Sequence, residues 1–435
     1  MMLGRAEKKG LVLVAVLWIV MLLTVMVATL GRNSRLDMKV RQITTETLRC
    51  KWACRAGIET AVGVLNEDPR ESDNLLDLWS DNDEDFNDIM LEGCWYNVRV
   101  IDESSKLNIN TVTKEQLLGL PYMEEYIADA IIDWRDNDDS PSGEGVEAGY
   151  YDNLPFPYRI RNGSLKTVRE LLLVKDVTEE LFYGEDTNLN DELDANERDG
   201  DENPPWDDGD DELDRGWISY LTCYSYDKNV DASGSNRVNI NEANERQLQN
   251  SLGIPQSQAQ WIVERRGNNG LNSIADLIDN STPQQPPQSS GRGSNQAQPL
   301  DLQTFYDIAD RITVDSGNQI AGRVNINTAP RDVLVALLGG EAADEETADN
   351  IVAYRVGLLD GMQSIAELLQ AGLVDMNTFK EIANSITTRS DVYTIRCVAT
   401  ADRGGNSGMR LQTEAVIDRS SSPCRILYWY EGASN

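Results

Sequence analysis

Residues 11–30 read LVLVAVLWIVMLLTVMVATL, a run of 20 residues without a charge, a proline or a glycine. This is the length that a helix needs to cross a hydrocarbon core of about 30 Å. In lipid such a run must be helical, because each backbone N–H and C=O has to find its partner within the segment. The stretch therefore predicts a transmembrane helix near the start of the chain.

The apolar pattern continues beyond this run as one face of an amphipathic helix. Apolar residues recur at spacings of three and four: Leu36, Val40, Ile43, Thr47, Cys50, Cys54, Ile58, Ala61 and Leu65. Asp68-Pro69 ends the pattern, because the residue before a proline disfavours helical geometry. We predict one helix over residues 11–66, about 80 Å long at 1.5 Å per residue. Its first half suits lipid and its second half suits packing on protein.

Composition excludes several functional classes. A length of 435 residues allows two or three domains, and a net charge of −34 argues against nucleic acid as a partner. The chain has no histidine, which removes histidine-based catalysis and histidine metal ligands. We recognise no nucleophile–base pair and expect no enzymatic activity. In an oxidising compartment the six cysteines could form up to three disulfides: Cys50, Cys54, Cys94, Cys223, Cys397 and Cys424. For Cys50 and Cys54 the alternative is that they remain buried thiols.

The residues before the apolar run resemble a processing site. Lys8-Lys9-Gly10 stands directly before Leu11. A signal anchor is the common explanation, and a cleaved secretory signal fits less well because the run is long and no small-residue site follows it. The sequence also resembles the leader of type IV pilin-like proteins, which prepilin peptidase cuts after a glycine. That resemblance implies a leader over residues 1–10 and cleavage between Gly10 and Leu11.

Ala15 departs from the pattern of most pilins, which carry glutamate as the fifth residue of the mature chain. A glutamate in lipid is costly unless it is paired, and in that family it is thought to pair with the terminal amine of a neighbouring subunit. Its absence is typical of the minor pseudopilin K of type II secretion systems. The resemblance implies a subunit at the end of a filament.

A pentapeptide with a basic first residue and the ending Asn-Ile-Asn occurs three times, at residues 106–110, 237–241 and 323–327. Such repeats indicate a repeated structural unit. Each copy is followed by a helix-start pattern and then by a second helical pattern that ends in an arginine: Arg135, Arg266 and Arg355. The order resembles helix-hairpin-helix motifs, which commonly bind DNA through a glycine hairpin.

The hairpin positions argue against DNA binding here. Residues 120–123, 253–256 and 339–342 do not keep Gly-x-Gly, and only Arg265-Arg266 offers a doubled positive charge. We therefore favour a helical scaffold. The alternative is a membrane-anchored helix-hairpin-helix protein that binds or takes up DNA.

An acidic segment has the ligand spacing of an EF-hand-like calcium loop. The candidate ligands are Asp186, Asn188, Asn190, Glu192 through its backbone carbonyl, Asp194 and Glu197. Asp191 replaces the usual glycine. A weaker second site uses Asp208, Asp210, Glu212 and Asp214. The sequence predicts calcium as a cofactor in the loop 186–214, and the alternative is a solvated acidic loop.

Alternating aromatic and β-branched residues predict a strand or a paired edge at residues 217–226, and strands at residues 93–102, 391–401, 409–418 and 426–430. We expect residues 93–102 to pair with the last three. The predicted fold is α+β, with the long helix on an antiparallel, pilin-like sheet from residues 67–103 and 388–435. A helical insertion of helix-hairpin-helix-like repeats occupies 104–387, with a low-complexity linker at 282–299.

The order of these features resembles the type II secretion system minor pseudopilin K family (general secretion pathway protein K) over nearly the whole chain. The resemblance implies a single-pass inner-membrane protein with its bulk in the periplasm. It implies that the protein caps the pseudopilus and forms a tip complex with the minor pseudopilins I and J. That complex starts assembly, and the major pseudopilin lies below it. Leu36, Val40 and Ile43 are the expected partner-binding residues. A minor pilin of a type IV pilus is the alternative.

Overall fold

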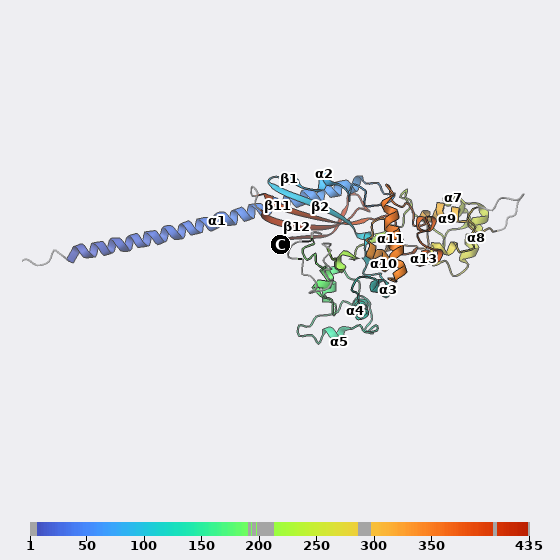
Figure 1. Cartoon of the computed structure of the whole chain (residues 1–435), viewed down its shortest axis with the longest axis horizontal. Helices are drawn as coiled ribbons and strands as arrows, with labels where there is room; N and C mark the ends of the chain where they lie inside the picture. Colours follow the sequence, from blue (N-terminus) through green and yellow to red (C-terminus); the bar gives the residue numbers. More distant parts are fainter. Residues whose placement is uncertain are drawn as a thin grey trace, which may run out of the picture.

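The computed structural model describes residues 7–189, 193, 197, 213–285, 297–402 and 407–433. One long helix, α1 (Glu7–Glu67), projects from a body that contains the main sheet and a helical region (Figure 1). The helix is straight through the end of the apolar run, so the lipid-type and protein-type segments form one rod. This confirms the predicted long N-terminal helix.

The main sheet is antiparallel and has the strand order β1-β2-β11-β12-β13. Its strands are β1 (Ile89–Leu91), β2 (Cys94–Asp102), β11 (Val392–Asp402), β12 (Ser407–Asp418) and β13 (Arg425–Ala433). The pairing of β2 with β11 places Arg99 opposite Arg396. The predicted pairing of residues 93–102 with the C-terminal strands is therefore confirmed, and the helical region is inserted between two adjacent strands.

The second half of α1 packs on this sheet. Cys54, Ile58 and Ala61 are at most 2% exposed and share a core with Val98 of β2 and Ile395 of β11. The buried positions repeat at spacings of three and four, as the apolar stripe predicts. Burial of a side chain such as Ile58 contributes about 1.5–3 kcal/mol. The sheet is thus the support from which the first half of α1 extends.

The helical region contains the repeat as three strand–helix–helix units. The units are β3 (Leu107–Asn108), α3 (Lys114–Leu118) and α4 (Glu125–Arg135); β6 (Val238–Asn239), α7 (Glu245–Leu252) and α8 (Gln256–Arg266); and β9 (Val324–Asn325), α10 (Arg331–Leu338) and α11 (Ala342–Val356). Each short strand pairs in parallel with a later one: β4 (Leu221–Thr222), β7 (Ile312–Thr313) and β10 (Ile386–Thr387). The helix-hairpin-helix assignment of these units stays a prediction.

The two asparagines of each repeat explain why the pattern recurs. In the first unit the Asn110 N–H donates to Oδ1 of Asn108 at 3.0 Å, which forms a local turn. The Asn110 side chain then exchanges two hydrogen bonds with the backbone of Leu165. Asn241 makes the same pair with Leu271, and Asn327 makes it with Met362. Each repeat therefore fastens the end of its short strand to a segment that follows the second helix of the unit.

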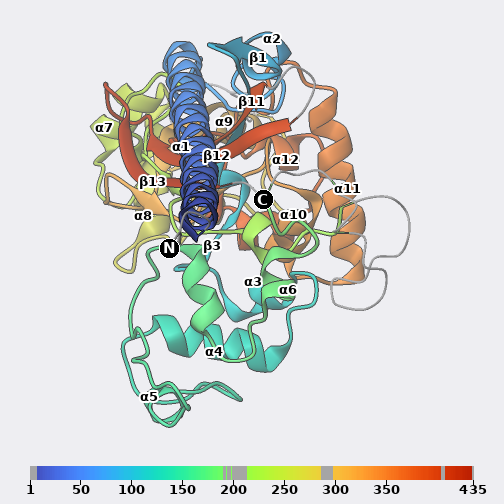
Figure 2. The same cartoon turned by 90° about the vertical axis from the view of Figure 1, so that its left-hand side faces the viewer.

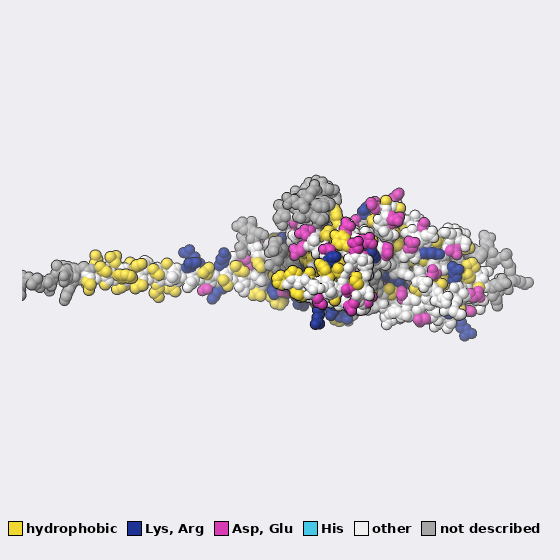
Figure 3. All heavy atoms as spheres, turned by 90° about the horizontal axis from the view of Figure 1, so that it is seen from below, with side chains coloured by type: hydrophobic (Ala, Val, Ile, Leu, Met, Phe, Trp, Pro, Cys, Tyr) yellow, Lys and Arg dark blue, Asp and Glu magenta, His cyan; other side chains and the backbone are white. Residues whose placement is uncertain are grey.

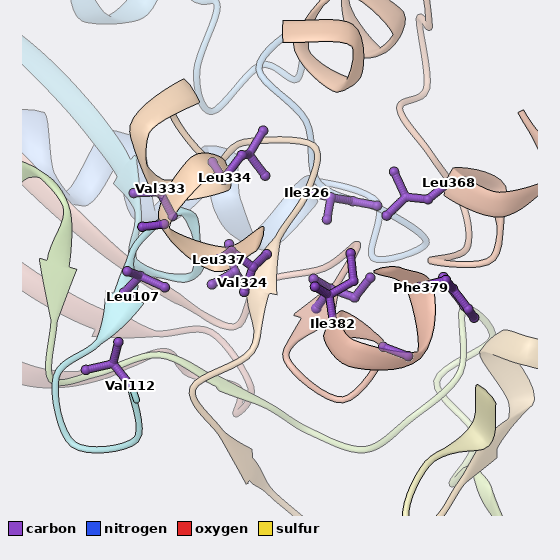
Figure 4. Packing of buried hydrophobic residues seen from close by; sticks show 14 of the residues in the cluster. Leu107, Val112, Val324, Ile326, Val333, Leu334, Leu337, Leu368, Phe379 and Ile382 are labelled. Carbon is purple, nitrogen blue, oxygen red and sulfur yellow. The ribbon is translucent and has the colours of Figure 1, made fainter. Parts of the chain in front are cut away.

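The three units share one apolar core. Figure 4 shows part of it, including Leu107 of the first unit and Val324 and Val333 of the third. The view along α1 shows that the body spreads well beyond the helix, with α7 on one side, α11 on the other and α4 below (Figure 2). The molecule is therefore a thin rod attached to a broad head.

Short elements complete the head. These are η1 (Glu103–Ser105), α5 (Ala148–Tyr151), η2 (Val168–Leu173), α6 (Glu179–Tyr183), η3 (Trp217–Ser219), β5 (Tyr226–Asp227), η4 (Ile274–Leu277), α9 (Leu302–Ile308), η5 (Ala309–Arg311), β8 (Ile320–Ala321), α12 (Glu367–Gln370) and α13 (Met376–Ile382). A further helix, α2 (Asp83–Phe86), lies beside the main sheet.

Residues 217–226 form no continuous strand, and of the two expectations the paired edge is the one that agrees with the structure. Trp217 begins a 3₁₀ turn, and the segment then supplies two-residue strands to two different partners, β3 and β8. Trp217 is 1% exposed, and its indole N–H donates to the carbonyl of Pro121 at 2.8 Å. The buried tryptophan turns the chain away from the extended path. Most of the predicted linker, residues 286–296, lies outside the described residues.

Candidate functional site

The apolar face of α1 changes from exposed to buried halfway along the helix. Leu36, Val40 and Ile43 are 52%, 62% and 41% exposed, whereas Cys50 and Cys54 on the same face are 0% exposed. Every residue from 11 to 45 is exposed. The predicted partner-binding residues therefore lie on a surface that no described part of this chain covers. We call Leu36, Val40 and Ile43 the exposed stripe.

The first part of α1 is long and apolar enough to cross a membrane, judged by length and composition. Gly10 and Leu11 lie in the first turns of the helix. Basic side chains follow the apolar run directly, at Arg32, Arg35, Lys39 and Arg41, and they separate it from the head (Figure 3). The exposed stripe lies at this junction, beside the basic residues and just outside the apolar run.

The structure brings four of the six cysteines together in two pairs where α1 meets the sheet. Cys50 Sγ lies 3.7 Å from Cys94 Sγ. Cys54 Sγ donates to the carbonyl oxygen of Cys397 at 3.4 Å. Burial raises the pKa of the Cys50 thiol to about 12, so this thiol stays protonated near neutral pH. The sequence left the pairing open, and the fold places Cys50 beside Cys94 and Cys54 beside Cys397.

Arg419 anchors the end of α1, a role that the sequence patterns did not indicate. Its side chain is 1% exposed and pairs with Asp68, 2.7 Å away, and with Asp73. The guanidinium also lies over the ring of Tyr393, 4.9 Å from its centroid. The Tyr393 hydroxyl donates to Asp73 at 2.7 Å. The segment after α1 is thereby tied to β11 and to the turn after β12. From the sequence, Asp68-Pro69 indicated only the end of a helix.

The two ends of the predicted calcium loop are held together. The Glu185 N–H donates to the Asp214 carbonyl, and the Asp214 N–H donates to the Glu185 carboxylate, each at 2.9 Å. Gly184 has a φ of +67°, and a Cβ on it would lie 2.3 Å from the backbone nitrogen of Gly216. Only glycine fits this close crossing. The chain therefore enters and leaves the loop at one place, where Glu185 and Asp214 are hydrogen-bonded. We call this place the neck of the loop.

The first and last predicted ligands of the loop are both buried. Asp186 is 2% exposed and Glu197 is 4% exposed, although both are acidic. The Thr187 hydroxyl donates to Oε1 of Glu197 at 3.2 Å, which brings loop positions 2 and 12 together. Asn188 is half-buried. An EF-hand-like site needs its twelfth residue near the start of the loop, and the contact with Thr187 holds Glu197 there.

The remaining predicted ligands lie outside the described residues: Asn190, Glu192, Asp194, Asp208, Asp210 and Glu212. Asp214 of the weaker second site lies at the neck of the loop. The calcium sites therefore stay predictions.

The arginines that end the second helix of each unit are used inside the protein. Arg266 Nη1 donates to the carbonyls of Ile240 and Ala243 at 2.8 and 2.7 Å. Arg135 and Arg355 make the equivalent bonds in the first and third units. Phosphate binding needs clustered basic side chains that are free to contact it. The recurrence of these arginines is thus explained by structure, which weakens the DNA-binding alternative.

Two family models match the head of the molecule. Both describe protein K of the type II secretion system, one over residues 105–183 and the other over residues 324–389. The first range contains the first repeat unit, and the second contains the third repeat unit.

Curated relatives give the same family. The chain is 29% identical over 198 residues to the type II secretion system protein K of Pseudomonas aeruginosa, covering 39% of this chain and 58% of that protein. It is 25% identical over 204 residues to the protein K of Aeromonas hydrophila, covering 40% of this chain and 60% of that protein. The matched part thus spans about 60% of the length of these relatives.

Among solved structures, the chain is similar to one from the crystal structure of the GspK-GspI-GspJ complex of enterotoxigenic Escherichia coli. The two share 13% identity with a TM-score of 0.48, over 91% of this chain and 100% of the other.

Proposed function

We propose that this chain, which matches models of the type II secretion system protein K family over residues 105–183 and 324–389, is a pseudopilin of that family that caps the pseudopilus and helps to start its assembly. In this proposal α1 is rooted in the inner membrane and the head lies in the periplasm. The protein then acts by assembly and not by catalysis. Its partners are the minor pseudopilins I and J, with the major pseudopilin below them.

The exposed stripe is the observation that carries the proposal. Leu36, Val40 and Ile43 continue the same helix face that packs on the sheet from Cys50 onward, yet they are 41–62% exposed. Apolar surface of this kind gains about 25 cal/mol for each Å² that a partner covers. The long helices of neighbouring subunits are the natural partners. In a filament they run side by side with α1, so they can cover the exposed stripe along its length.

The shape of the head supports a place at the end of a filament. The body spreads beyond the axis of α1 on several sides (Figure 2). Subunits in a filament shaft repeat at short intervals along the axis, and a head of this breadth would collide with the subunits above it. At the tip no subunit lies above, so the same head is accommodated.

Substitution in the exposed stripe tests the proposal. Val40→Glu and Ile43→Glu place charges on the stripe and should abolish co-purification with the I- and J-type pseudopilins. Met38→Glu is the matched control, because Met38 is 60% exposed and lies on the opposite side of the helix. Co-purification that survives the stripe substitutions, or fails equally with Met38→Glu, would contradict the proposal.

We also propose that prepilin peptidase removes residues 1–10. Support comes from Lys9 and Gly10 directly before the apolar run. N-terminal sequencing of the mature protein should begin at Leu11. Retention of residue 1 or 2 would exclude this cleavage and favour a signal anchor.

Calcium binding by the loop 186–214 is a further part of the proposal. It is supported by the ligand spacing and by the burial of Asp186 and Glu197 at the two ends of the twelve-residue motif. A chelator should lower the melting temperature. Asp194→Ala should reduce the rise in melting temperature that Ca²⁺ causes. Asp199→Ala, just outside the motif, is the control. If Ca²⁺ raises the melting temperature of Asp194→Ala as much as that of the wild type, this site is excluded.

A further inference from the structure

Four of the six cysteines lie at one interface, where α1 packs on the main sheet. Cys50 and Cys54 stand about one turn apart on α1, Cys94 begins β2, and Cys397 lies in the middle of β11. All four are 0% exposed and belong to the same apolar core. We call them the interface cysteines. They come from three elements that are distant in sequence, so a bond between them fixes how α1 sits on the sheet.

The contacts of the interface cysteines join each helix cysteine to one strand cysteine. Cys50 Sγ lies 3.7 Å from Cys94 Sγ. Cys54 Sγ lies 3.4 Å from the carbonyl oxygen of Cys397, and the two thiols of this pair also interact directly. A disulfide bond is about 2.05 Å long, and rotation about the Cα–Cβ bonds of two facing cysteines moves their sulfurs together. Both pairs are therefore placed to form a disulfide.

The sheet argues against the other pairings of the interface cysteines. Cys397 stands opposite Val98, which is four residues beyond Cys94 on β2, so the two strand cysteines lie about 13 Å apart along the ladder. A disulfide needs Cα atoms closer than about 7 Å. A bridge between Cys50 and Cys54 would therefore leave both strand cysteines without a partner. The crossed pairing would break both observed contacts.

The interface cysteines do not surround a single point, as the ligands of a metal ion do. Four thiolates around one ion form a structural zinc site. Among the described residues, the groups of three or more side chains whose ligand atoms lie within 4.8 Å of one another contain carboxylates alone. The four thiols thus form two separate pairs, which is the arrangement of two disulfides.

We propose that the interface cysteines form two disulfides, Cys50–Cys94 and Cys54–Cys397, while the protein folds in an oxidising compartment. The inference rests on the proposed periplasmic position of the head, because thiols stay reduced in the cytosol. The oxidant is a thiol oxidase that carries a disulfide of its own. In each pair one thiolate attacks that disulfide and forms a mixed disulfide, and the second thiolate displaces the oxidase from it. The oxidase leaves as a dithiol, with the two electrons and the two protons.

Burial sets the order of oxidation and packing. Burial raises the pKa of the Cys50 thiol to about 12, and only a thiolate attacks a disulfide. The bridges therefore form before the interface closes, and the closed interface then shields them from reductants. The finished bonds attach one turn of α1 to both β2 and β11. A force along the rod is then transmitted to the head without separating the helix from the sheet.

Alkylation of the protein from cells tests the pairing. The full-length protein is purified from membranes in detergent, with N-ethylmaleimide present from lysis onward, and is then unfolded in guanidinium chloride with the same reagent and no reductant. Mass spectrometry of a digest should find the label on Cys223 and Cys424, which lie outside the interface. The interface cysteines should appear in cross-linked peptides. Label on any interface cysteine in most copies, or a link between Cys50 and Cys54, would overturn the proposal.

Serine variants supply the controls. Cys94→Ser should free Cys50, which then takes the label, and should leave the link between Cys54 and Cys397 intact. Cys424→Ser should leave both links unchanged. If Cys50 stays unlabelled in Cys94→Ser, it has another partner and the pairing is wrong. The measurement on the wild type stands by itself if a variant does not fold.

Refolding separates this inference from the proposed function. The reduced, unfolded protein is refolded in detergent with reduced and oxidised glutathione, which supply the oxidant without a periplasm, and circular dichroism checks the fold. Both links in the refolded protein and in the protein from cells support the inference. Links in the refolded protein alone overturn it for the protein in cells and count against a periplasmic head. Links in neither sample overturn the pairing and leave the role at the filament tip untouched.

Discussion

Gly57 of α1 and Val98 of β2 approach so closely that a Cβ on the glycine would lie 2.7 Å from Cγ2 of the valine. The same Cβ would meet Cys397 Sγ of β11 at 3.0 Å. Gly57 therefore lies where the helix backbone and the sheet are in close contact. At Gly63, further along the same helix, an added Cβ would have no neighbouring atom within 4 Å. The two glycines form a matched pair for testing how α1 packs.

Gly57→Ala should destabilise the protein, and Gly63→Ala should stabilise it. Alanine in a helix is favoured over glycine by about 0.5–1 kcal/mol, which is the gain expected at the open position. At Gly57 the extra methyl overpacks the core at a cost of about 1–3 kcal/mol, which exceeds that gain. Urea unfolding of the two variants measures the difference. Equal and favourable effects would show that α1 does not rest on the sheet at Gly57.

The cysteine pairs give a chemical test of the same interface. Diamide takes two electrons and two protons from a pair of thiols and leaves a disulfide. Added while the reduced protein refolds, before the fold buries the thiols, it should join Cys50 to Cys94, whose sulfurs lie 3.7 Å apart in the folded protein. Mass spectrometry of a digest should find that cross-linked peptide lighter by two hydrogens. Cys94→Ser should abolish it. A bridge between Cys50 and Cys54 in its place would contradict the packing of α1.

Local patterns in the sequence predicted the rod and the sheet. The spacing from Leu36 to Leu65 depends only on helix periodicity, so it gave the buried face of α1 from Cys50 onward. The alternation in residues 93–102 and 391–401 likewise gave strands that pair. In each case the sequence pattern and the helix or strand that it predicts occupy the same short segment. The pattern can therefore be interpreted without knowing which distant residues the segment contacts.

Contacts between distant segments account for what the sequence did not predict. Residues 217–226 form two-residue strands with β3 and β8, and nothing within the segment specifies these partners. Arg419 pairs with Asp68, which is 351 residues away. The narrow neck of the loop 186–214 depends on Glu185 and Asp214, which are remote in sequence and carry no local pattern that pairs them.

Asp227 joins the second and third repeat units through their first residues. Its carboxylate accepts from Arg237 at 3.0 Å and lies 3.6 Å from Arg323, and the side chain is 5% exposed. Asp227→Asn leaves two buried guanidinium groups without this charge, and loss of one member of a buried pair costs about 3–5 kcal/mol. Asp349→Asn is the control, because Asp349 pairs with Arg331 at an exposed site where the cost is about 0–1 kcal/mol. Equal losses in urea unfolding would contradict the buried bridge.

The loss of unfolding free energy caused by Asp227→Asn should depend on pH. Arg237 and Arg323 hold the pKa of Asp227 at about 2, although its burial acts in the opposite direction, and its ordinary value is 3.8. A carboxyl group with a lowered folded pKa stabilises the protein fully above its unfolded pKa and loses that contribution as the pH falls toward the folded value. The free-energy difference between the wild type and Asp227→Asn should therefore be constant above about pH 5 and shrink by about 2 kcal/mol toward pH 2. Asp102, whose pKa burial raises to about 6, is present in both proteins and cancels in the comparison. Urea unfolding at a series of pH values measures the difference, and a constant gap down to pH 2 would show that Asp227 is not held ionised by the two arginines.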